Sequence, residues 1–232
     1  MTPHTIIWDF DGTLYPLRPY DSEQTLLRLR RMQLKKWPYR IRRSLAGWLI
    51  YGDMHQWFKS RHSRQLYGLL YGWALRGTSV TLLDRAAEEI AALISPEDRE
   101  ALHNLHGNGF RMLIISCGTL DLSERILQKA DVLDCFEAVK ANPLRLKGGK
   151  INGIEPRLVT AEDKLSTAKE LICNNPRGVV AVGDGYTDIP LLDWTQYPVM
   201  MDPEQSKQPK HAAKPYYFVP SVGALPRLLT QL

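Results

Sequence analysis

Short apolar runs alternate along the chain with longer segments of helical periodicity. Most of the short runs lack the alternation of polar and apolar residues that marks a half-exposed strand, as expected of strands that are covered on both faces. These runs are residues 5–10, 111–116, 179–183, 199–201 and 216–219. The pattern predicts an α/β fold with a doubly wound parallel sheet, in which ligands bind beyond the carboxyl ends of the strands.

Helix start and stop signals agree with this alternation. One helix is expected to begin after Ser95 and to end at Gly107, and a second begins at residue 160 or 161 and runs toward Ile172. Residues 144–156 carry two consecutive glycines between short extended runs, which predicts a β-hairpin on the same core.

The segment 16–94 breaks the alternation. Its apolar residues indicate helices and no strand. Interruptions of these helices are expected at the pair Trp37-Pro38 and around the glycines Gly68, Gly72 and Gly77. We therefore assign residues 1–15 and 95–232 to the core and residues 16–94 to a mostly helical domain inserted into it.

The composition is that of a folded protein without a membrane span. The 232 residues are 44% apolar, which is enough to bury a core. The longest strongly apolar stretch is about half of what crosses a bilayer, and the N-terminal residues lack the features of a signal peptide, so we expect a soluble, cytoplasmic protein. Cys117, Cys135 and Cys173 have no CxxC spacing, so we expect reduced, mostly buried thiols.

Charge is distributed unevenly. From Arg18 to Arg85 there are 14 Lys or Arg against 4 Asp or Glu, a net charge of +10, whereas the rest of the chain has a net charge of −5. The segment between Arg28 and Arg43 has eight basic residues and no acid. This contrast indicates that the inserted domain and the core have different roles.

Polar side chains stand where the predicted strands end or where the next helix begins. They are Asp9 and Asp11, Ser116, Lys164, and Asp184 and Asp188. Several carboxylates at one edge of a sheet repel each other, and such a group is tolerated when it holds a divalent cation. Oxygen ligands without His or Cys favour Mg²⁺, which often binds substrate phosphate as well.

The order of these residues resembles the haloacid dehalogenase (HAD) superfamily and, within it, the phosphatases similar to phosphoserine phosphatase. The matching motifs are DFDGT at residues 9–13, Ser116 in ISCGT, Lys164, and GDGYTD at residues 183–188. The resemblance implies a Rossmann-like core and a helical cap of the C1 type, inserted after the first motif. It covers the core, while the insertion matches in position and helical character only.

The chemistry of the residues agrees with the roles that this resemblance implies. Asp9 is expected to attack phosphorus and form an aspartyl-phosphate, and Asp11 to act as general acid and base. Phosphate-binding groups are expected from Thr13, Ser116, Cys117, Gly118 and Lys164, mostly through electrostatic stabilisation. Metal ligands are expected from Asp9, Asp184 and the backbone carbonyl of Asp11, with Asp188 as a ligand through water or as an anchor for Lys164. In the family, an acid at the position of Asp11 distinguishes phosphatases from dehalogenases.

Three hypotheses on function follow. The first is a Mg²⁺-dependent phosphomonoester hydrolase that acts on a small, anionic phosphorylated metabolite. In the second, the cap presents phospholipid headgroups or nucleic-acid ends, since basic residues among aromatics attract nucleic acids and anionic lipids; Arg28 to Arg43 would make this contact. The third is an anion-binding protein without catalysis. An alternative role for the ten aromatics of the insertion is to form its own core, with the basic residues in solvent.

Overall fold

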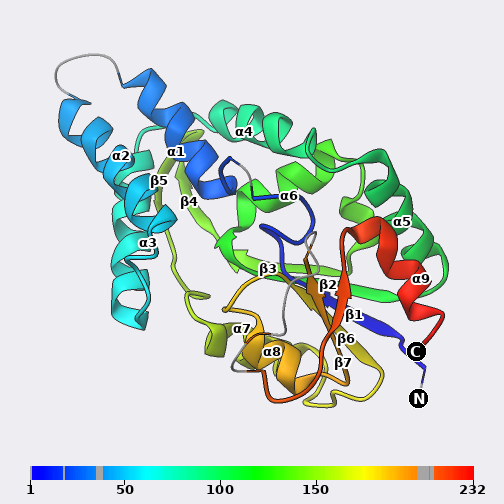
Figure 1. Ribbon diagram of the computed structural model, residues 1–232. Coiled ribbons are helices and arrows are strands. Elements are labelled where there is room, and N and C mark those ends of the chain that lie inside the picture. Colours follow the sequence, from blue (N-terminus) through cyan, green and yellow to red (C-terminus); the bar gives the residue numbers. More distant parts are fainter. Residues whose placement is uncertain (1, 18, 35–38, 203–208, 210–211) are drawn as a thin grey trace.

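The centre of the molecule is a six-stranded, all-parallel sheet (Figure 1). The computed structural model describes residues 2–17, 19–34, 39–202, 209 and 212–232. The strands lie in the order β3-β2-β1-β6-β7-β8. Their bounds are β1 Thr5–Trp8, β2 Arg111–Thr119, β3 Ala138–Asn142, β6 Val179–Gly183, β7 Tyr197–Met201 and β8 Tyr217–Val219. All five strands predicted from the apolar runs are present.

Alternate residues of the central strands face two separate cores. Ile6 and Trp8 of β1 pack in one apolar cluster, and Ile7 packs in the other. Helices cover both faces, with α5 and α6 on the first cluster and α7 and α8 on the second. The bounds are α5 Pro96–Gly107, α6 Leu120–Lys129, α7 Ala161–Leu171, α8 Ile189–Trp194 and, at the C-terminus, α9 Leu225–Leu229. The prediction of a doubly wound α/β fold is therefore confirmed.

Local sequence signals correctly predict where two of these helices begin and where the hairpin lies. The hydroxyl of Ser95 accepts a hydrogen bond from the backbone N–H of Asp98 and begins α5, and Thr160 begins α7 with a capping box to Asp163. The predicted hairpin is formed by β4 (Leu144–Lys147) and β5 (Lys150–Ile154). Two short 3₁₀ turns complete the core, η2 Leu133–Cys135 and η3 Val222–Ala224.

The insertion between β1 and α5 is helical in the part that the structure describes. Its helices are α1 Ser22–Gln33, α2 Arg40–Met54, α3 Arg61–Leu75 and α4 Thr81–Ala91. α2 and α3 lie side by side at the outer edge of the molecule, away from the sheet (Figure 1). α4 instead packs along α6, where Arg125 pairs with Asp84 and Lys129 with Glu88.

Two of the predicted helix interruptions are wrong. α3 runs without a break through Gly68 and Gly72. A Cβ atom at Gly68 would lie 2.9 Å from the Pro156 side chain, and one at Gly72 would lie 2.9 Å from the backbone nitrogen of Ile154. These glycines therefore allow α3 to pack closely against β5. An interruption does occur at Gly77, which has a φ of +78°, and Trp37-Pro38 lies outside the described residues.

The cysteines are free, but they are not all buried. Cys135 is buried, Cys117 is half-buried and Cys173 is exposed. Cys173 has a φ of +52° just after α7 ends, in a turn at the surface, so the prediction of a buried thiol is wrong there. None of the helices in the described part of the chain has the length and apolarity needed to cross a bilayer.

Candidate active site

The carboxyl ends of β1, β2 and β6 meet at one edge of the sheet because these strands are parallel neighbours. Asp9 follows β1 directly, and its backbone N–H donates to the carbonyl of Val182 at 2.8 Å. Asp184 follows β6. Ser116 was expected at a strand end, but β2 continues to Thr119 after an irregularity in its pairing with β3. A bulge of this kind redirects side chains and is frequent beside active sites.

Lys164 enters this edge from the first turn of α7 and is almost completely buried, with 1% of its surface exposed. Its Nζ lies 2.5 Å from Oδ1 of Asp9 and 2.7 Å from Oδ1 of Asp188. Burial alone would lower the pKa of Lys164, but the carboxylates of Asp188 and Asp9 raise that pKa well above its usual value. Lys164 is therefore a fixed positive charge that joins two acids from different loops.

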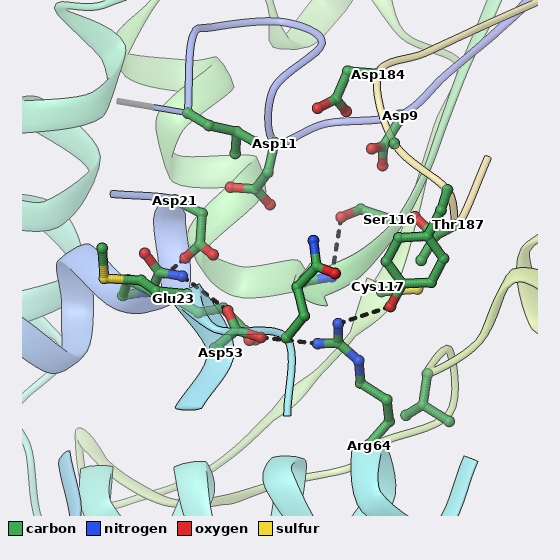
Figure 2. Close-up of a pocket in the computed structure, with 18 of the residues that line it drawn as sticks. Asp9, Asp11, Asp21, Glu23, Asp53, Arg64, Ser116, Cys117, Asp184 and Thr187 are labelled. Atoms are coloured by element: carbon green, nitrogen blue, oxygen red, sulfur yellow. Dashed lines mark hydrogen bonds and ion pairs between the residues drawn. The ribbon is translucent and has the colours of Figure 1, made fainter. Parts of the chain in front are cut away.

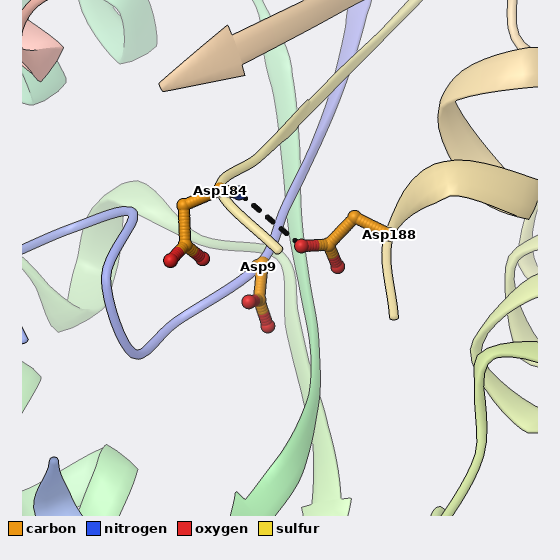
Figure 3. Close-up of side chains that lie close together, drawn as sticks. All are labelled: Asp9, Asp184 and Asp188. Carbon is orange, nitrogen blue, oxygen red and sulfur yellow. Dashed lines mark hydrogen bonds between the residues drawn. The ribbon is translucent and has the colours of Figure 1, made fainter. Parts of the chain in front are cut away.

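Three carboxylates gather around one point, those of Asp9, Asp184 and Asp188 (Figure 3). One ligand atom from each lies within 4.8 Å of the others. Burial and then the charge of Asp188 raise the pKa of Asp9 to about 7, although Lys164 opposes this shift. Burial and then the charges of Asp9 and Asp188 raise the pKa of Asp184 to about 8. Since one lysine does not neutralise three acids, the oxygen-only group fits a divalent cation.

Asp188 holds the loop that carries Asp184. Its Oδ2 accepts hydrogen bonds from the backbone N–H groups of Asp184 at 3.2 Å and Gly185 at 3.0 Å, while its Oδ1 pairs with Lys164. Asp188 is 1% exposed and fully engaged by these donors. Its contacts are those of an anchor for Lys164 and for the loop.

The turn after Asp9 brings the first and last motifs into contact. Gly12 has a φ of +83°, which favours glycine, and a Cβ atom there would lie 2.2 Å from Oδ2 of Asp184. The hydroxyl of the buried Thr13 donates to Oδ1 of Asp184 at 3.4 Å. The turn therefore fits closely against the Asp184 carboxylate.

Asp11 has a different environment from the three clustered acids. Its Oδ1 accepts a hydrogen bond from the hydroxyl of Tyr15 and one from the backbone N–H of Ser22 at 2.8 Å. Its Oδ2 faces Gly118, where a Cβ atom would lie 3.1 Å from that oxygen and 3.2 Å from Oγ of Ser116. Burial and Asp11 raise the pKa of Tyr15 well above its usual value, so the phenol remains a donor. Asp11 thus points one fixed oxygen toward the Ser116 loop.

The loop after Ser116 is held by Asn142, a residue that the sequence analysis missed. Its side-chain amide donates to the carbonyls of Cys117 at 2.7 Å and Leu158 at 2.8 Å. Its side-chain oxygen accepts from the backbone N–H groups of Arg157 and Leu158. Burial raises the pKa of Cys117 to about 12, so its thiol stays protonated and is a packing group.

A cavity of about 810 Å³ joins this edge of the sheet to the inserted helices (Figure 2). From the sheet it is lined by Asp9, Asp11, Ser116, Cys117, Gly118, Lys164 and Asp184. Its opposite wall includes side chains that the sequence analysis did not assign, namely Asp21, Glu23, Asp53 and Arg64, and Tyr186 of the loop after β6 lines the cavity as well. Every predicted site residue except Thr13 and Asp188 therefore borders one cavity, and those two form hydrogen bonds with Asp184 and Lys164, which line it.

The opposite wall carries charges of both signs. Arg64 pairs with Asp53 at 3.0 Å and donates to the hydroxyl of Tyr186 at 3.1 Å. Glu23 accepts from the hydroxyl of Thr119 at 2.8 Å, and burial raises the pKa of Glu23 to about 8. A sequence signal for this wall did exist, since Asp21, Glu23 and Asp53 are three of the four acids in the basic stretch from Arg18 to Arg85.

The strongly basic segment between Arg28 and Arg43 does not border the cavity among the residues that the structure describes. Arg28 pairs with Glu89 of α4, and Arg30 donates to the backbone carbonyl of Arg76. Of the aromatics of the insertion that the structure describes, Phe58, Tyr67 and Tyr71 are buried in the core, Tyr20 is half-buried, and the exposed ones are Tyr39, Trp48, Tyr51, Trp57 and Trp73.

Fold and site together define an α/β protein with a candidate divalent-metal site at the carboxyl edge of a doubly wound sheet. The profile of one family, described as haloacid dehalogenase-like hydrolase, matches residues 6–193. The chain belongs to this haloacid dehalogenase-like hydrolase family.

Individual proteins similar to this chain include phosphoserine phosphatases and a nucleotidase. A phosphoserine phosphatase of Streptococcus thermophilus is 28% identical over 98 residues, which are 40% of this chain and 44% of the relative. The match thus covers less than half of the length of that relative. A substrate-bound phosphoserine phosphatase structure covers 100% of this chain and 99% of its own, with 17% identity and a TM-score of 0.68. A cytosolic 5′-nucleotidase IIIB bound to cytidine covers 86% of this chain and 73% of its own, with 16% identity and a TM-score of 0.62.

Proposed function

We propose that the protein is a Mg²⁺-dependent phosphomonoester hydrolase that forms an aspartyl-phosphate on Asp9. The observation that carries this proposal is the meeting of Asp9, Asp184 and Asp188 within 4.8 Å, with the buried Lys164 bound to two of them. This group opens into a cavity that also contains Asp11. Membership of the hydrolase family agrees with the same chemistry.

The metal would be held by Asp9, by Asp184 and by the backbone carbonyl of Asp11. Asp188, whose oxygens already bind Lys164 and two backbone N–H groups, would position the site. A bound Mg²⁺ supplies positive charge to phosphoryl oxygens, which lowers the barrier to attack by an anion. Burial and then mutual repulsion raise the pKa values of Asp9 and Asp184, and the positive charge of the same ion would offset both effects.

Each protein group has a definite task in the proposed reaction. A carboxylate oxygen of Asp9 forms a bond to phosphorus while the bond from phosphorus to the leaving oxygen breaks. Oδ2 of Asp11 gives its proton to that oxygen, and it later takes a proton from the water that attacks the phospho-aspartate and releases phosphate. Ser116 and Lys164 stabilise negative charge on the phosphoryl oxygens. Tyr15 and Ser22 hold Oδ1 of Asp11 throughout.

The leaving group would lie against the helical wall of the cavity. Since this wall presents Asp21, Glu23 and Asp53 together with Arg64, we expect a small, polar leaving group that carries an amine as well as acceptor groups. This differs from a purely anionic metabolite. Phosphorylated amino acids and amino alcohols fit the wall, in line with the phosphoserine phosphatases among the related proteins.

The inserted segment 16–94 would act as a cap. Glu23 of α1, Asp53 of α2 and Arg64 of α3 line the cavity, together with Asp21, the residue that caps the start of α1. In this position the segment excludes water from the phosphoryl group and selects the leaving group.

Turnover is expected to require Mg²⁺. It is also expected to be fastest on phosphomonoesters whose leaving group carries an amine. Protein treated with a chelator should lose its activity, and Mg²⁺ should restore it, because a cation offsets the three clustered carboxylates. A panel would contain phosphoserine, phosphoethanolamine, nucleoside monophosphates, a sugar phosphate and p-nitrophenyl phosphate, with released phosphate as the readout. Hydrolysis that persists fully without a metal, or no hydrolysis of any phosphomonoester by protein that binds Mg²⁺, would contradict the proposal.

Gly12→Ala should weaken Mg²⁺ binding and turnover by about 100-fold, because the new methyl group displaces the Asp184 carboxylate from its place. Gly109→Ala is the matched control. Gly109 has a similar φ of +81°, but nothing lies within 4 Å of the position of its Cβ atom. Calorimetric titration with Mg²⁺ measures both variants, and equal affinities in the two would show that the clash with Asp184 does not matter.

A further inference from the structure

The outer side of α2 carries large apolar side chains that remain exposed. Ile41, Trp48 and Tyr51 are 75%, 43% and 53% exposed. Their spacing places them along one side of the helix, opposite Ala46 and Leu49, which are completely buried. α2 therefore has two apolar sides, of which only one is used in the fold.

This surface continues beyond the C-terminal end of α2. Met54 is 53% exposed and Trp57 is 49% exposed. The ring of Trp57 packs edge to face against Trp48, with centroids 6.0 Å apart, and against Tyr51 at 5.4 Å. We call these five residues, Ile41, Trp48, Tyr51, Met54 and Trp57, the aromatic face.

The surroundings of the aromatic face are positively charged. From residue 40 to residue 59, the stretch that contains the face, the sequence has four Lys or Arg and a single acid, Asp53. Asp53 borders the cavity, where it pairs with Arg64. Arg40 and Arg43 are exposed in the first turn of α2, next to Ile41. The face therefore combines exposed aromatics with basic residues and carries no carboxylate of its own, so it is complementary to an anionic surface.

A bilayer fits this surface better than the alternatives. Trp and Tyr favour the headgroup level of a membrane, and basic residues are attracted to anionic lipids. Ile41 and Met54 gain by entering the acyl boundary, whereas neither side chain provides a stacking platform for a nucleic-acid base. A second copy of the chain would bring two positive faces together, which repel each other.

We propose that the aromatic face docks the protein on anionic membranes, with α2 lying in the plane of the interface. The argument is independent of the proposed hydrolase activity. It has a consequence for that activity, because Met54 also lines the cavity, as do Gln56 and Lys59 on either side of Trp57. Docking would therefore place the rim of the cavity at the membrane surface.

The test is cosedimentation of the full-length protein with vesicles. Wild type should bind vesicles of phosphatidylglycerol and phosphatidylcholine, and binding to phosphatidylcholine alone should be weaker. Trp48→Glu should lower binding to the anionic vesicles by about tenfold or more, because it places a charge within the face. Tyr217→Glu is the matched control, since Tyr217 is 40% exposed on β8, outside the aromatic face, and should leave vesicle binding unchanged.

Each outcome of this test decides the proposal. Absence of wild-type binding to the anionic vesicles at low salt overturns it, and so does equal binding by wild type and Trp48→Glu. Binding of a single-stranded oligonucleotide that Trp48→Glu abolishes, without vesicle binding, assigns the face to nucleic acid instead. Circular dichroism checks the fold of each variant. Trp48 is outside the cavity, so Trp48→Glu should keep the wild-type turnover of a soluble phosphomonoester if the hydrolase proposal holds.

Discussion

Asp9→Asn is expected to lower phosphomonoester hydrolysis by about 10⁴-fold or more, which is the scale seen when a central catalytic group is removed. An amide is a poor nucleophile, and it cannot form the proposed aspartyl-phosphate. Asparagine keeps the volume of the side chain, and its carbonyl oxygen can still accept a hydrogen bond from Lys164. The fold should therefore survive, and thermal unfolding should stay cooperative.

The control for this variant is a change of the same type on the surface. Glu100 of α5 is exposed, and Glu100→Gln should leave both the turnover and the unfolding temperature unchanged. If Asp9→Asn retained a tenth of the wild-type turnover under conditions where it is fully folded, Asp9 would not be the nucleophile. A variant that lost activity only because it unfolded would be recognised by the loss of its thermal transition.

Lys164→Met is expected to lower the free energy of unfolding by about 3–5 kcal/mol, as well as removing turnover. The methionine replaces the buried stem of the lysine but leaves the carboxylates of Asp9 and Asp188 without their shared partner. Because both acids are almost fully buried, water does not replace the lost contacts. Chemical denaturation of the metal-free protein measures this loss.

Two further variants separate charge from packing. Lys169→Met changes a lysine on the same helix that lies over the Trp194 ring, and it should cost about 1 kcal/mol or less. The double variant Lys164→Met with Asp188→Asn should recover part of the stability, since one of the unpaired charges is removed. A loss below about 1 kcal/mol for Lys164→Met alone would mean that the buried ion pairs do not hold this edge of the sheet together.

The sheet edge could be predicted because its signals are local. Each strand that carries a site residue reads as a buried run, and parallel strands bring their carboxyl ends together without further information. Asp9 and Asp184 follow two such strands, and Lys164 follows the capping residue Thr160 of α7. Strand β3 was missed because its sequence, AVKAN, is short and contains the exposed Lys140, as expected for the edge strand that it is.

The helical wall could not be predicted because it depends on how helices pack. The sequence indicates that Asp21, Glu23 and Asp53 lie on or next to helices, but their direction is set by contacts between α1, α2 and α3. Gly68 and Gly72 were predicted to interrupt a helix. In a single sequence, a glycine that permits close packing cannot be told from a glycine that ends a helix. Asn142 is the last residue of β3 and was missed with that strand, although its side chain holds the loop that contains Cys117.

The most direct test is to look for the phosphoryl group on the protein. Wild type mixed with Mg²⁺ and a substrate from the panel, quenched in acid within one turnover and digested, should yield the peptide around Asp9 with the added mass of one phosphoryl group. Reduction with borohydride, which cleaves an acyl phosphate, should mark the same residue, and Asp9→Asn should yield no marked peptide. Turnover without any modification of Asp9, or a phosphoryl group found on another residue, would contradict the account.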